Sequence, residues 1–327
     1  MRRLTSLRFG VVAVVVALTV GAAGAAPIIV STTQTEVTIG GLACGTQYRV
    51  RVNVAGDSRI TTLKPVTKPC PLPPPAPPPP PPPGGEPAPI AGQGYIIAFQ
   101  DQFDTFNTSI WTPHSFWETE VPGSVAVSNG TLKIDNKRSD GYPAAISVSS
   151  GPTWGGEQSH YDFKFGYAEA RMRFTGGKGS WPAFWLSSSA HAEWPNWPQC
   201  PEPDLNFELD IMEYQGDEPN TFYGTTHRNT GGVCGLSDQT RGDWPNLGLN
   251  LSVDWHKYAV LWTANSIKWY VDEQLVIEKA PFDSSDQDMY ILLTMQACGW
   301  DGTNDCDANT ADVLRTEVDW VRVWQKP

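Results

Sequence analysis

The sequence predicts an all-β fold, an antiparallel sandwich or barrel of about 230 residues that fills the C-terminal part of the chain. Three observations support this fold class. From about residue 94 onwards, short runs rich in β-branched and aromatic residues alternate with clusters of Gly, Pro, Asn and Asp, as in strands joined by turns. The runs recur at regular intervals, and no long stretch has the apolar period of an amphipathic helix. The clearest runs cover residues 166–174, 207–214, 257–261, 266–271 and 317–324.

The first 25 residues have the composition of a secretory signal peptide. Two arginines follow Met1, an apolar run covers residues 11–20, and small residues end at Ala25, after which we expect cleavage. A membrane anchor is the alternative, but the apolar run is shorter than the roughly 20 residues that a spanning helix needs. The sequence therefore predicts a secreted, extracellular protein with no membrane span after cleavage.

Two segments separate this leader (residues 1–25) from the β-rich region. Residues 27–69 alternate polar and apolar side chains, which predicts a pair of strands. Within them, residues 42–48 resemble the corner before the sixth strand of fibronectin type III domains, so we interpret residues 27–69 as a partial module of that type and assign it no binding role. Residues 70–92 contain a long run of Pro followed by two glycines, which predicts a stiff linker.

Composition excludes one class of partner and favours another. The net charge is −12 and no cluster of Lys or Arg follows the leader, which does not fit a nucleic-acid-binding protein and disfavours polyanionic partners such as sulfated sugars. The 14 Trp residues offer flat, amphipathic surfaces on which the C–H faces of sugar rings can stack. Packing in the core is the alternative, and we expect it for about half of them.

The six cysteines indicate disulfides, because their number is even and the chain is expected to be exported. We expect neighbours along the chain to pair: Cys44 with Cys70, Cys200 with Cys234, and Cys298 with Cys306. A zinc site is not expected, since paired C-x-x-C spacing and suitable neighbouring histidines are missing.

Three acidic residues crowd one predicted strand, residues 207–214. Alternation places Glu208 and Asp210 on one face, and a β-bulge near residues 211–212 would turn Glu213 to the same face. Like charges along one face repel each other, and no Lys or Arg is interleaved to neutralise them. A catalytic function explains this arrangement, with an exposed acidic strand or a calcium site as the alternatives.

Glycoside hydrolysis is a reaction that needs such a set of acids. One carboxylate attacks or stabilises the anomeric carbon, and a second, protonated carboxyl group donates its proton to the leaving oxygen. The two groups must titrate apart, and a third acid beside them helps to separate their pKa values. We therefore predict a glycosidase in which Glu208, Asp210 and Glu213 are the catalytic residues.

These residues and six further segments resemble glycoside hydrolase family 16. The sequence Glu-Leu-Asp-Ile-Met-Glu at residues 208–213 is similar to the Glu-x-Asp-x-x-Glu signature of its laminarinase-type members, which are endo-β-1,3-glucanases. The resemblance implies a catalytic domain over residues 93–327 with a concanavalin A-like jelly-roll fold, a β-sandwich of two curved antiparallel sheets. The other matching segments are residues 101–104, 167–172, 179–186, 255–258, 267–272 and 318–323.

The resemblance also implies roles for individual residues. Glu208 would be the nucleophile, Glu213 the general acid and then base, and Asp210 the residue that hydrogen-bonds the nucleophile, in a mechanism that retains the anomeric configuration. The implied function is hydrolysis of internal β-1,3 or β-1,3/1,4 bonds of a β-glucan. Residues 293–300 depart from the family pattern, which puts the linkage and the sugar in doubt and leaves the acid chemistry untouched. The alternatives are the same chemistry on a β-galactan or with transfer to another sugar, and, from a different class, a non-catalytic lectin.

Five more residues are expected to bind substrate. Glu169 and Arg171 lie two apart on one strand, so both can face the cleft, with a surface ion pair as the alternative. Trp181 and Trp185 share a face and would stack on sugar rings, with core packing as the alternative. His227 matches a family position near the general acid, and its other interpretation is a structural histidine.

The predicted chemistry requires no cofactor. Asp319 matches a position that binds a structural calcium ion in some family members, so the resemblance implies a possible calcium site. A polysaccharide, a β-glucan, is the expected partner, and we expect the protein to be a monomer.

Overall fold

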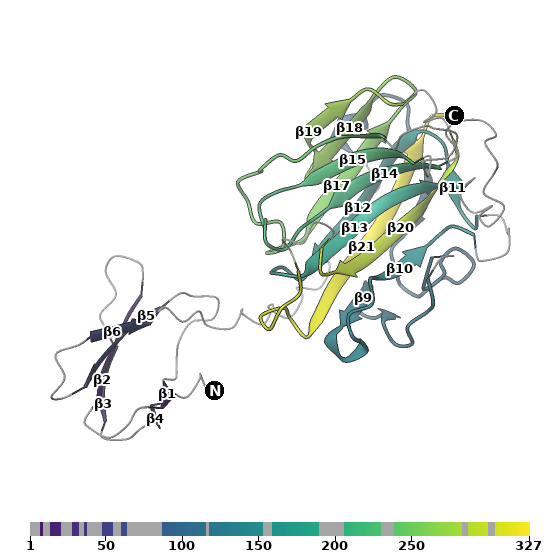
Figure 1. Cartoon of the computed structure of the whole chain (residues 1–327). Coiled ribbons are helices and arrows are strands. Elements are labelled where there is room, and N and C mark those ends of the chain that lie inside the picture. The colour runs from purple at the N-terminus through teal and green to yellow at the C-terminus, as the bar shows by residue number, and fades with distance from the viewer. Residues whose placement is uncertain are drawn as a thin grey trace. The chain divides into compact units, whose positions relative to one another are not determined.

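The structure is a computed structural model. It describes residues 87–115, 118–152, 159–189, 206–229, 239–282, 287–299 and 305–327, together with strand backbones between residues 7 and 63. The chain divides into two compact units, Met1–Pro79 and Pro80–Pro327, which Figure 1 shows. Each unit is described by itself.

The N-terminal unit contains two sets of paired strands. β1 (Leu7–Arg8) pairs with β4 (Glu36–Val37), and a four-stranded sheet has the order β3-β2-β5-β6. The strands of this sheet are β2 Val14–Val20, β3 Ile28–Thr32, β5 Tyr48–Val54 and β6 Ile60–Leu63. Strand β2 lies within the expected leader, whose cleavage stays a prediction, as does the fibronectin type III remnant. The linker up to residue 86 and both Cys44 and Cys70 lie outside the described residues.

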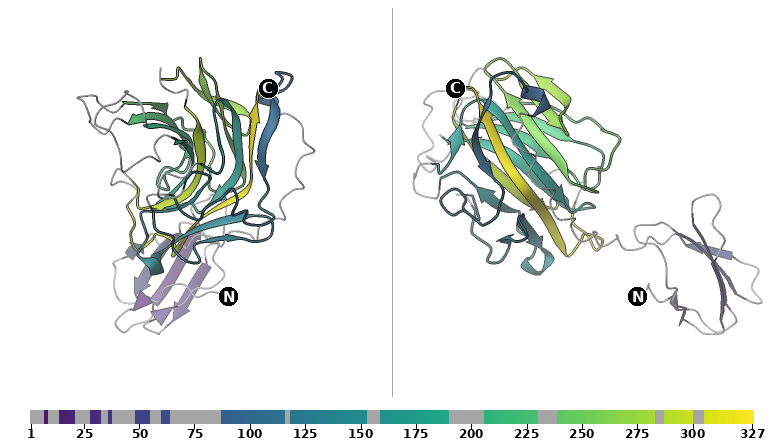
Figure 2. Two further views of the ribbon diagram at one scale, coloured as in Figure 1. Left: turned by 90° about the vertical axis from the view of Figure 1, so that its right-hand side faces the viewer. Right: turned by 180° about the vertical axis from the view of Figure 1, so that it is seen from behind.

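The C-terminal unit is a sandwich of two antiparallel sheets, which Figure 2 shows as curved layers lying against each other. We name them the front sheet, with the order β10-β20-β13-β14-β15-β16 and β11 paired to β20, and the back sheet, with the order β19-β18-β17-β12-β21-β9-β8 and β7 paired to β21. Among the described residues, helical structure is limited to η1 (Ala88–Ile90) and η2 (Arg138–Asp140), and no helix is long and apolar enough to cross a membrane. The prediction of an all-β sandwich is confirmed.

Most strands are short, as the turn chemistry of the sequence predicts, and β21 is the longest at 13 residues. The front-sheet strands are β10 Ala145–Ser149, β11 Asp162–Phe163, β13 Ser180–Ser188, β14 Asn206–Glu213, β15 Tyr223–Asn229, β16 Gln239–Asp243 and β20 Met289–Ala297. The back-sheet strands are β7 Ile96–Asp101, β8 Val125–Val127, β9 Leu132–Lys137, β12 Gly166–Phe174, β17 His256–Trp262, β18 Ile267–Val271, β19 Gln274–Lys279 and β21 Val313–Gln325.

The core lies between the two sheets, because each presents one apolar face to the other. On β12 the side chains of Ala168, Ala170 and Met172 enter this core, and on β13 those of Phe184 and Leu186 meet them from the opposite sheet. Burial of this apolar surface drives the layers together. The front sheet therefore has its alternate residues free for polar chemistry on the face away from the core.

A tight turn joins β18 and β19 in the segment that matched the family. Asp272 and Glu273 have positive φ angles of 49° and 67°, the geometry of a two-residue turn that fits the twist of a hairpin. The Asp272 carboxylate accepts hydrogen bonds from Lys257 N at 2.9 Å and His256 Nδ1 at 2.7 Å. These bonds offset the strain of a left-handed conformation without glycine.

One disulfide is described, between Cys298 and Cys306, as the sequence predicts. It joins the end of β20 in the front sheet to the segment that leads into β21 in the back sheet. Cys200 and Cys234 lie outside the described residues, so their pairing stays a prediction.

Candidate active site

A β-bulge is present in β14 at the position that the sequence predicts. Opposite β13, Asp210 pairs with Trp185, but it is Met212 that pairs with Phe184, so Ile211 is the extra residue. On the other side of β14, the register with β15 shifts between Asp210 and Glu213. Ile211 and Met212 are both buried in the core, so two successive side chains point inward and the alternation is reset beyond them.

The bulge brings three acids to one face of the front sheet. Asp210 is 3% exposed, whereas Glu208 and Glu213 are half-buried. Trp181 Nε1, from β13, donates a hydrogen bond to Glu213 Oε1 at 3.0 Å, and His227 Nε2, from β15, lies 3.1 Å from Asp210 Oδ2. Glu213 therefore points away from the hydrophobic interior.

The back sheet holds the bulge in place. A bulge interrupts the hydrogen-bond ladder, and buried backbone groups beside it need other partners. The fully buried Trp269, on β18, donates from Nε1 to the carbonyl oxygen of Asp210 at 2.8 Å. Gly224, on β15, leaves room for this indole, because a Cβ at that position would lie 2.8 Å from Trp269 Cδ1.

Asp210 is surrounded by donors. Thr225 Oγ1 donates to Asp210 Oδ2 at 2.5 Å, and His227 is oriented from its other side by Thr240 Oγ1, 2.8 Å from Nδ1. Burial alone would lower the pKa of His227, but its hydrogen bond to Asp210 and the negative charge there outweigh burial and raise the pKa to about 9. At neutral pH His227 is therefore a cation that faces the three carboxyl groups.

The pKa values of both glutamates are raised above the ordinary value. Burial raises the pKa of Glu208 to about 8, Asp210 adds to this effect, and the His227 cation opposes it. Burial and then the charge of Asp210 raise the pKa of Glu213 well above its ordinary value, although the Trp181 hydrogen bond opposes them. Burial favours the protonated form of Glu213, as a general acid requires, and the His227 cation opposes the effect of burial on Glu208, as a nucleophile requires.

The structure brings three of the five predicted substrate-binding residues to the acids. Trp181 contacts Glu213 directly, Trp185 lies opposite Asp210 on the neighbouring strand and is half-buried, and His227 contacts Asp210. For Trp181 the contact shows a further role, because its indole N–H stabilises the ionised form of Glu213.

The prediction that Glu169 and Arg171 face the cleft is wrong. They do share a face of β12, but β12 belongs to the back sheet and its Ala and Met residues fill the core, so both side chains lie on the outer face of that sheet. Glu169 accepts a hydrogen bond from Tyr167 Oη at 3.0 Å, and burial raises its pKa to about 7. Arg171 Nη1 lies 2.7 Å from Asp319 Oδ2.

The surroundings of Asp319 do not favour the predicted calcium site. Its Oδ2 already has the Arg171 guanidinium as a partner, and a positive side chain at the carboxylate competes with a metal cation. Calcium binding stays a prediction.

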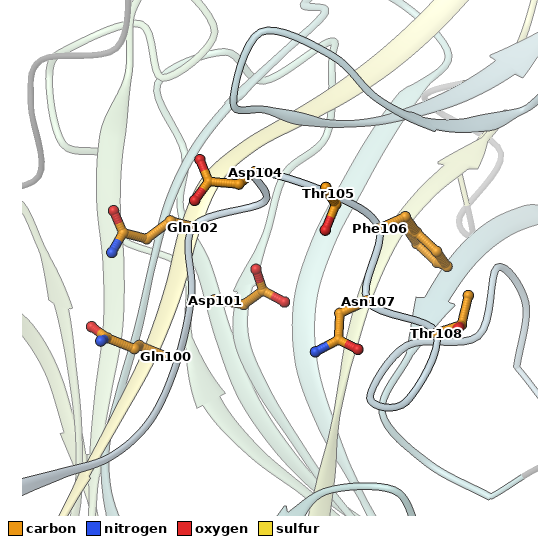
Figure 3. A pocket seen from close by; sticks show the side chains of 8 residues that line it. All are labelled: Gln100, Asp101, Gln102, Asp104, Thr105, Phe106, Asn107 and Thr108. Carbon is orange, nitrogen blue, oxygen red and sulfur yellow. The ribbon is translucent and has the colours of Figure 1, made fainter.

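A separate polar pocket lies at the end of β7. Its volume is about 470 Å³, and Figure 3 shows the eight side chains that line it, from Gln100 to Thr108. Asp101, at its base, accepts hydrogen bonds from Phe103 N and Trp111 Nε1, both at 2.8 Å. The pocket includes none of the residues predicted for the site.

Among the described residues, Glu208, Asp210 and His227 form a set whose metal-ligating atoms lie within 4.8 Å of one another. A metal requires a neutral imidazole, whereas Asp210 holds His227 protonated at neutral pH. The set therefore fits acid–base chemistry better than a metal centre.

Two residues of the site were not predicted. Thr225 lies two positions before His227 and so on the same face of β15, and alternation alone could have identified it. Trp269 carries no such signal, because its contact with Asp210 spans 59 residues of sequence.

Comparison with known proteins agrees with this geometry. Residues 115–322 match the family described as Glycosyl hydrolases family 16, which is more than half of the chain. The chain belongs to this family, so the membership that the motifs indicated is confirmed.

Relatives and solved structures extend the comparison. The chain is 25% identical over 263 residues to the keratan-sulfate endo-1,4-beta-galactosidase of Sphingobacterium multivorum (73% of this chain, 57% of that protein). It is 27% identical over 247 residues to the endo-1,3-1,4-beta-glycanase EglC of Rhizobium meliloti (62% of this chain, 46% of that protein). It thus spans about half the length of these relatives. The endo-beta-1,3-glucanase structure from Pyrococcus furiosus is 26% identical, with a TM-score of 0.54, and covers 71% of this chain and 94% of that one.

The Trp269 hydrogen bond can be tested with Trp269→Phe, which removes the indole N–H and leaves the Asp210 carbonyl without that donor. We expect a loss of about 1–3 kcal/mol in the free energy of unfolding and a fall in kcat of roughly 10- to 100-fold with little change in KM, because the acids lose their alignment. Denaturant unfolding and steady-state kinetics measure the two effects.

Trp262→Phe is the matched control for this prediction. Trp262 is equally buried on β17, and its Nε1 has no hydrogen-bond partner among the described residues. The control should keep kcat within about twofold. Equal losses of kcat in both variants would show that the Asp210 contact has no special role.

The charge of His227 can be tested by pH dependence. His227→Gln removes a cation that lowers the pKa of Glu208, so protonation of the nucleophile begins at higher pH. We expect the acidic limb of the kcat/KM profile to move up by roughly 0.5–1 pH unit. Thr240→Ala, which keeps the imidazole, should shift the limb less. If the acidic limb of the His227→Gln profile stayed at the wild-type pH or moved to lower pH, His227 would not be the cation that lowers the pKa of Glu208.

Proposed function

We propose that this protein is a retaining endo-glycosidase that hydrolyses internal β-1,3 or β-1,3/1,4 glucosidic bonds of a β-glucan. The observation that carries the proposal is the bulged strand β14, which turns Glu213 to the face of Glu208 and Asp210. A nucleophile and an acid on one face can act on the same glycosidic bond.

The proposed reaction has two steps. The Glu208 carboxylate attacks the anomeric carbon while Glu213 gives its proton to the glycosidic oxygen, so the bond to the leaving sugar breaks and a glycosyl ester forms. Glu213, now a carboxylate, takes a proton from water, whose oxygen attacks the same carbon and releases Glu208. Two inversions retain the configuration. Asp210 accepts a hydrogen bond from Thr225 and lies beside His227, and its charge helps to raise the pKa of Glu213.

The choice of β-glucan rests on relatives. Both the Rhizobium meliloti glycanase and the Pyrococcus furiosus enzyme act, by their names, on β-1,3 or β-1,3-1,4 linkages. A net charge of −12 repels a sulfated chain in the long range, which argues against keratan sulfate as the substrate. The Sphingobacterium multivorum relative does favour an uncharged β-galactan as the second candidate substrate.

A lectin on the same fold is a weaker candidate. A binding protein has no use for two glutamates whose pKa values are raised by burial and by the charge of Asp210, an arrangement that costs free energy. The three acids and the bulge that aligns them support catalysis.

Release of reducing ends from laminarin, lichenan, agarose and galactan tests the proposal. We expect release from at least one of the first two, with the β-anomer formed first, as seen by NMR. Glu208→Gln and Glu213→Gln should each lower kcat by about 1,000-fold or more, because each removes a group that makes or breaks a bond.

Glu169→Gln is the control for these variants. It is the same substitution at a buried carboxyl group on the outer face of the back sheet, and it should keep the kcat of the wild-type enzyme. Release from galactans alone would select the second candidate, and no release from any polysaccharide would refute the glycosidase.

We also propose that the enzyme is secreted, acts as a monomer and needs no cofactor, since carboxyl groups alone supply the chemistry. After dialysis against EDTA, kcat should be unchanged. Expression of the full chain in an exporting host should yield extracellular protein that starts near residue 26 and elutes as a monomer. A loss of kcat in EDTA that only a divalent cation restores would contradict the absence of a cofactor. Protein retained in the cell would contradict secretion, and elution as a dimer or larger would contradict the monomer.

A further inference from the structure

An aromatic pair lies on the same side of the front sheet as the acids. Tyr223 is the β15 partner of Glu213, and Trp244 follows directly after β16, whose last residue, Asp243, pairs with Gly224. The register therefore places Trp244 beside Tyr223, and their ring centroids lie 6.3 Å apart at an interplanar angle of 49°.

Alternation shows which face this pair occupies. Thr225 and His227, at two and four residues from Tyr223, both contact Asp210, and Thr240, four residues before Trp244, contacts His227. Side chains at these even spacings share one face of the sheet. Tyr223 and Trp244 thus continue the surface that carries the three acids.

Trp244 is exposed and Tyr223 is half-buried, and the pair is held in position. Trp244 is 61% exposed, the most exposed of the tryptophans that the structure describes. Tyr223 Oη donates to Glu218 Oε2 at 2.7 Å, which fixes the tyrosine ring that supports the indole. An exposed indole supported by a half-buried tyrosine next to a catalytic group lies outside the core, and we interpret it as a ligand surface.

The position of the pair relative to the acids indicates which sugar it meets. Tyr223 lies opposite Glu213, the proton donor to the leaving oxygen, whereas Glu208 lies opposite His227, four residues further along β15. Trp244 is two strands away from β14, roughly 10 Å at the usual strand spacing. A ring stacked on it would thus belong to the leaving part of the polysaccharide, beyond the sugar next to the cleaved bond.

We propose that Tyr223 and Trp244 form a subsite that stacks a neutral pyranose ring on the leaving side of the cleaved bond. This inference rests on the proposed glycosidase function. The subsite gives the enzyme a preference for long chains, and it holds the leaving sugar close to the glycosyl ester, where its hydroxyl can compete with water for the anomeric carbon.

Trp244→Ala removes the stacking surface. For the β-glucan that the wild-type enzyme hydrolyses, we expect kcat/KM on the polysaccharide to fall about tenfold, mainly through KM. The loss should shrink as oligosaccharides are shortened, because the sugar over Trp244 is then missing. The ratio of transfer products to hydrolysis products should fall as well. Trp244→Phe should restore part of kcat/KM and part of the transfer ratio. Ile96→Ala, at a similarly exposed apolar residue of the back sheet, should change neither quantity.

A binding measurement separates this inference from the proposed function. In the Glu208→Gln background, titration with a long β-1,3-gluco-oligosaccharide should show an affinity about tenfold higher than in Glu208→Gln/Trp244→Ala. Equal affinities, or an equal fractional loss of kcat/KM on short and long substrates, would overturn the subsite. If the wild-type enzyme cleaves only galactans, the same comparison of affinities, made with a galacto-oligosaccharide, tests the subsite in the same way. If it cleaves nothing, the proposed function fails, and the titration by itself still tests whether Trp244 binds sugar.

Discussion

The hydrogen bond from the Trp269 indole to the Asp210 carbonyl oxygen joins the back sheet to the bulge that gathers the acids. Without an extra residue in β14, Glu213 would point into the core beside Ile211. The extra residue interrupts the regular ladder, and next to it a buried donor from the opposite layer binds the Asp210 carbonyl oxygen. The geometry of the site thus depends on the packing of the two sheets and not on β14 alone.

The second constraint is electrostatic. Three carboxyl groups on one face cannot all be ionised at low cost, and the structure distributes the charge among neighbours of different kinds. Asp210 has two donors, Thr225 and the His227 cation, whereas Glu213 has the neutral N–H of Trp181. Burial and the charge of Asp210 raise the pKa of Glu213, and the Trp181 N–H offsets only part of that effect.

The sequence predicts the chemistry of the site better than its surroundings. The acids and the bulge follow from local rules, since repulsion on one face and an alternation that fails at residue 213 need only β14 itself. Glu169 and Arg171 were misplaced because local rules give the face of a strand but not its sheet. Alternation correctly separates them from Ala168 and Ala170 on β12, but both sheets of a sandwich have a polar outer face, and nothing local tells which sheet a strand joins. Trp269 was not predicted because a contact between sheets leaves no periodic signal.

The disulfide between Cys298 and Cys306 joins the two sheets on the β10–β20 side of the front sheet. It ties β20 to the segment entering the back sheet, so on that side the layers cannot slide apart while the bond is intact. β16, at the other edge, has no described covalent link to the back sheet. There Lys279 Nζ of β19 lies 2.7 Å from Asp243 Oδ2, and Arg241 Nη1 donates to the carbonyl oxygen of Pro281 at 2.7 Å, so different kinds of bond join the layers on the two sides of the sandwich.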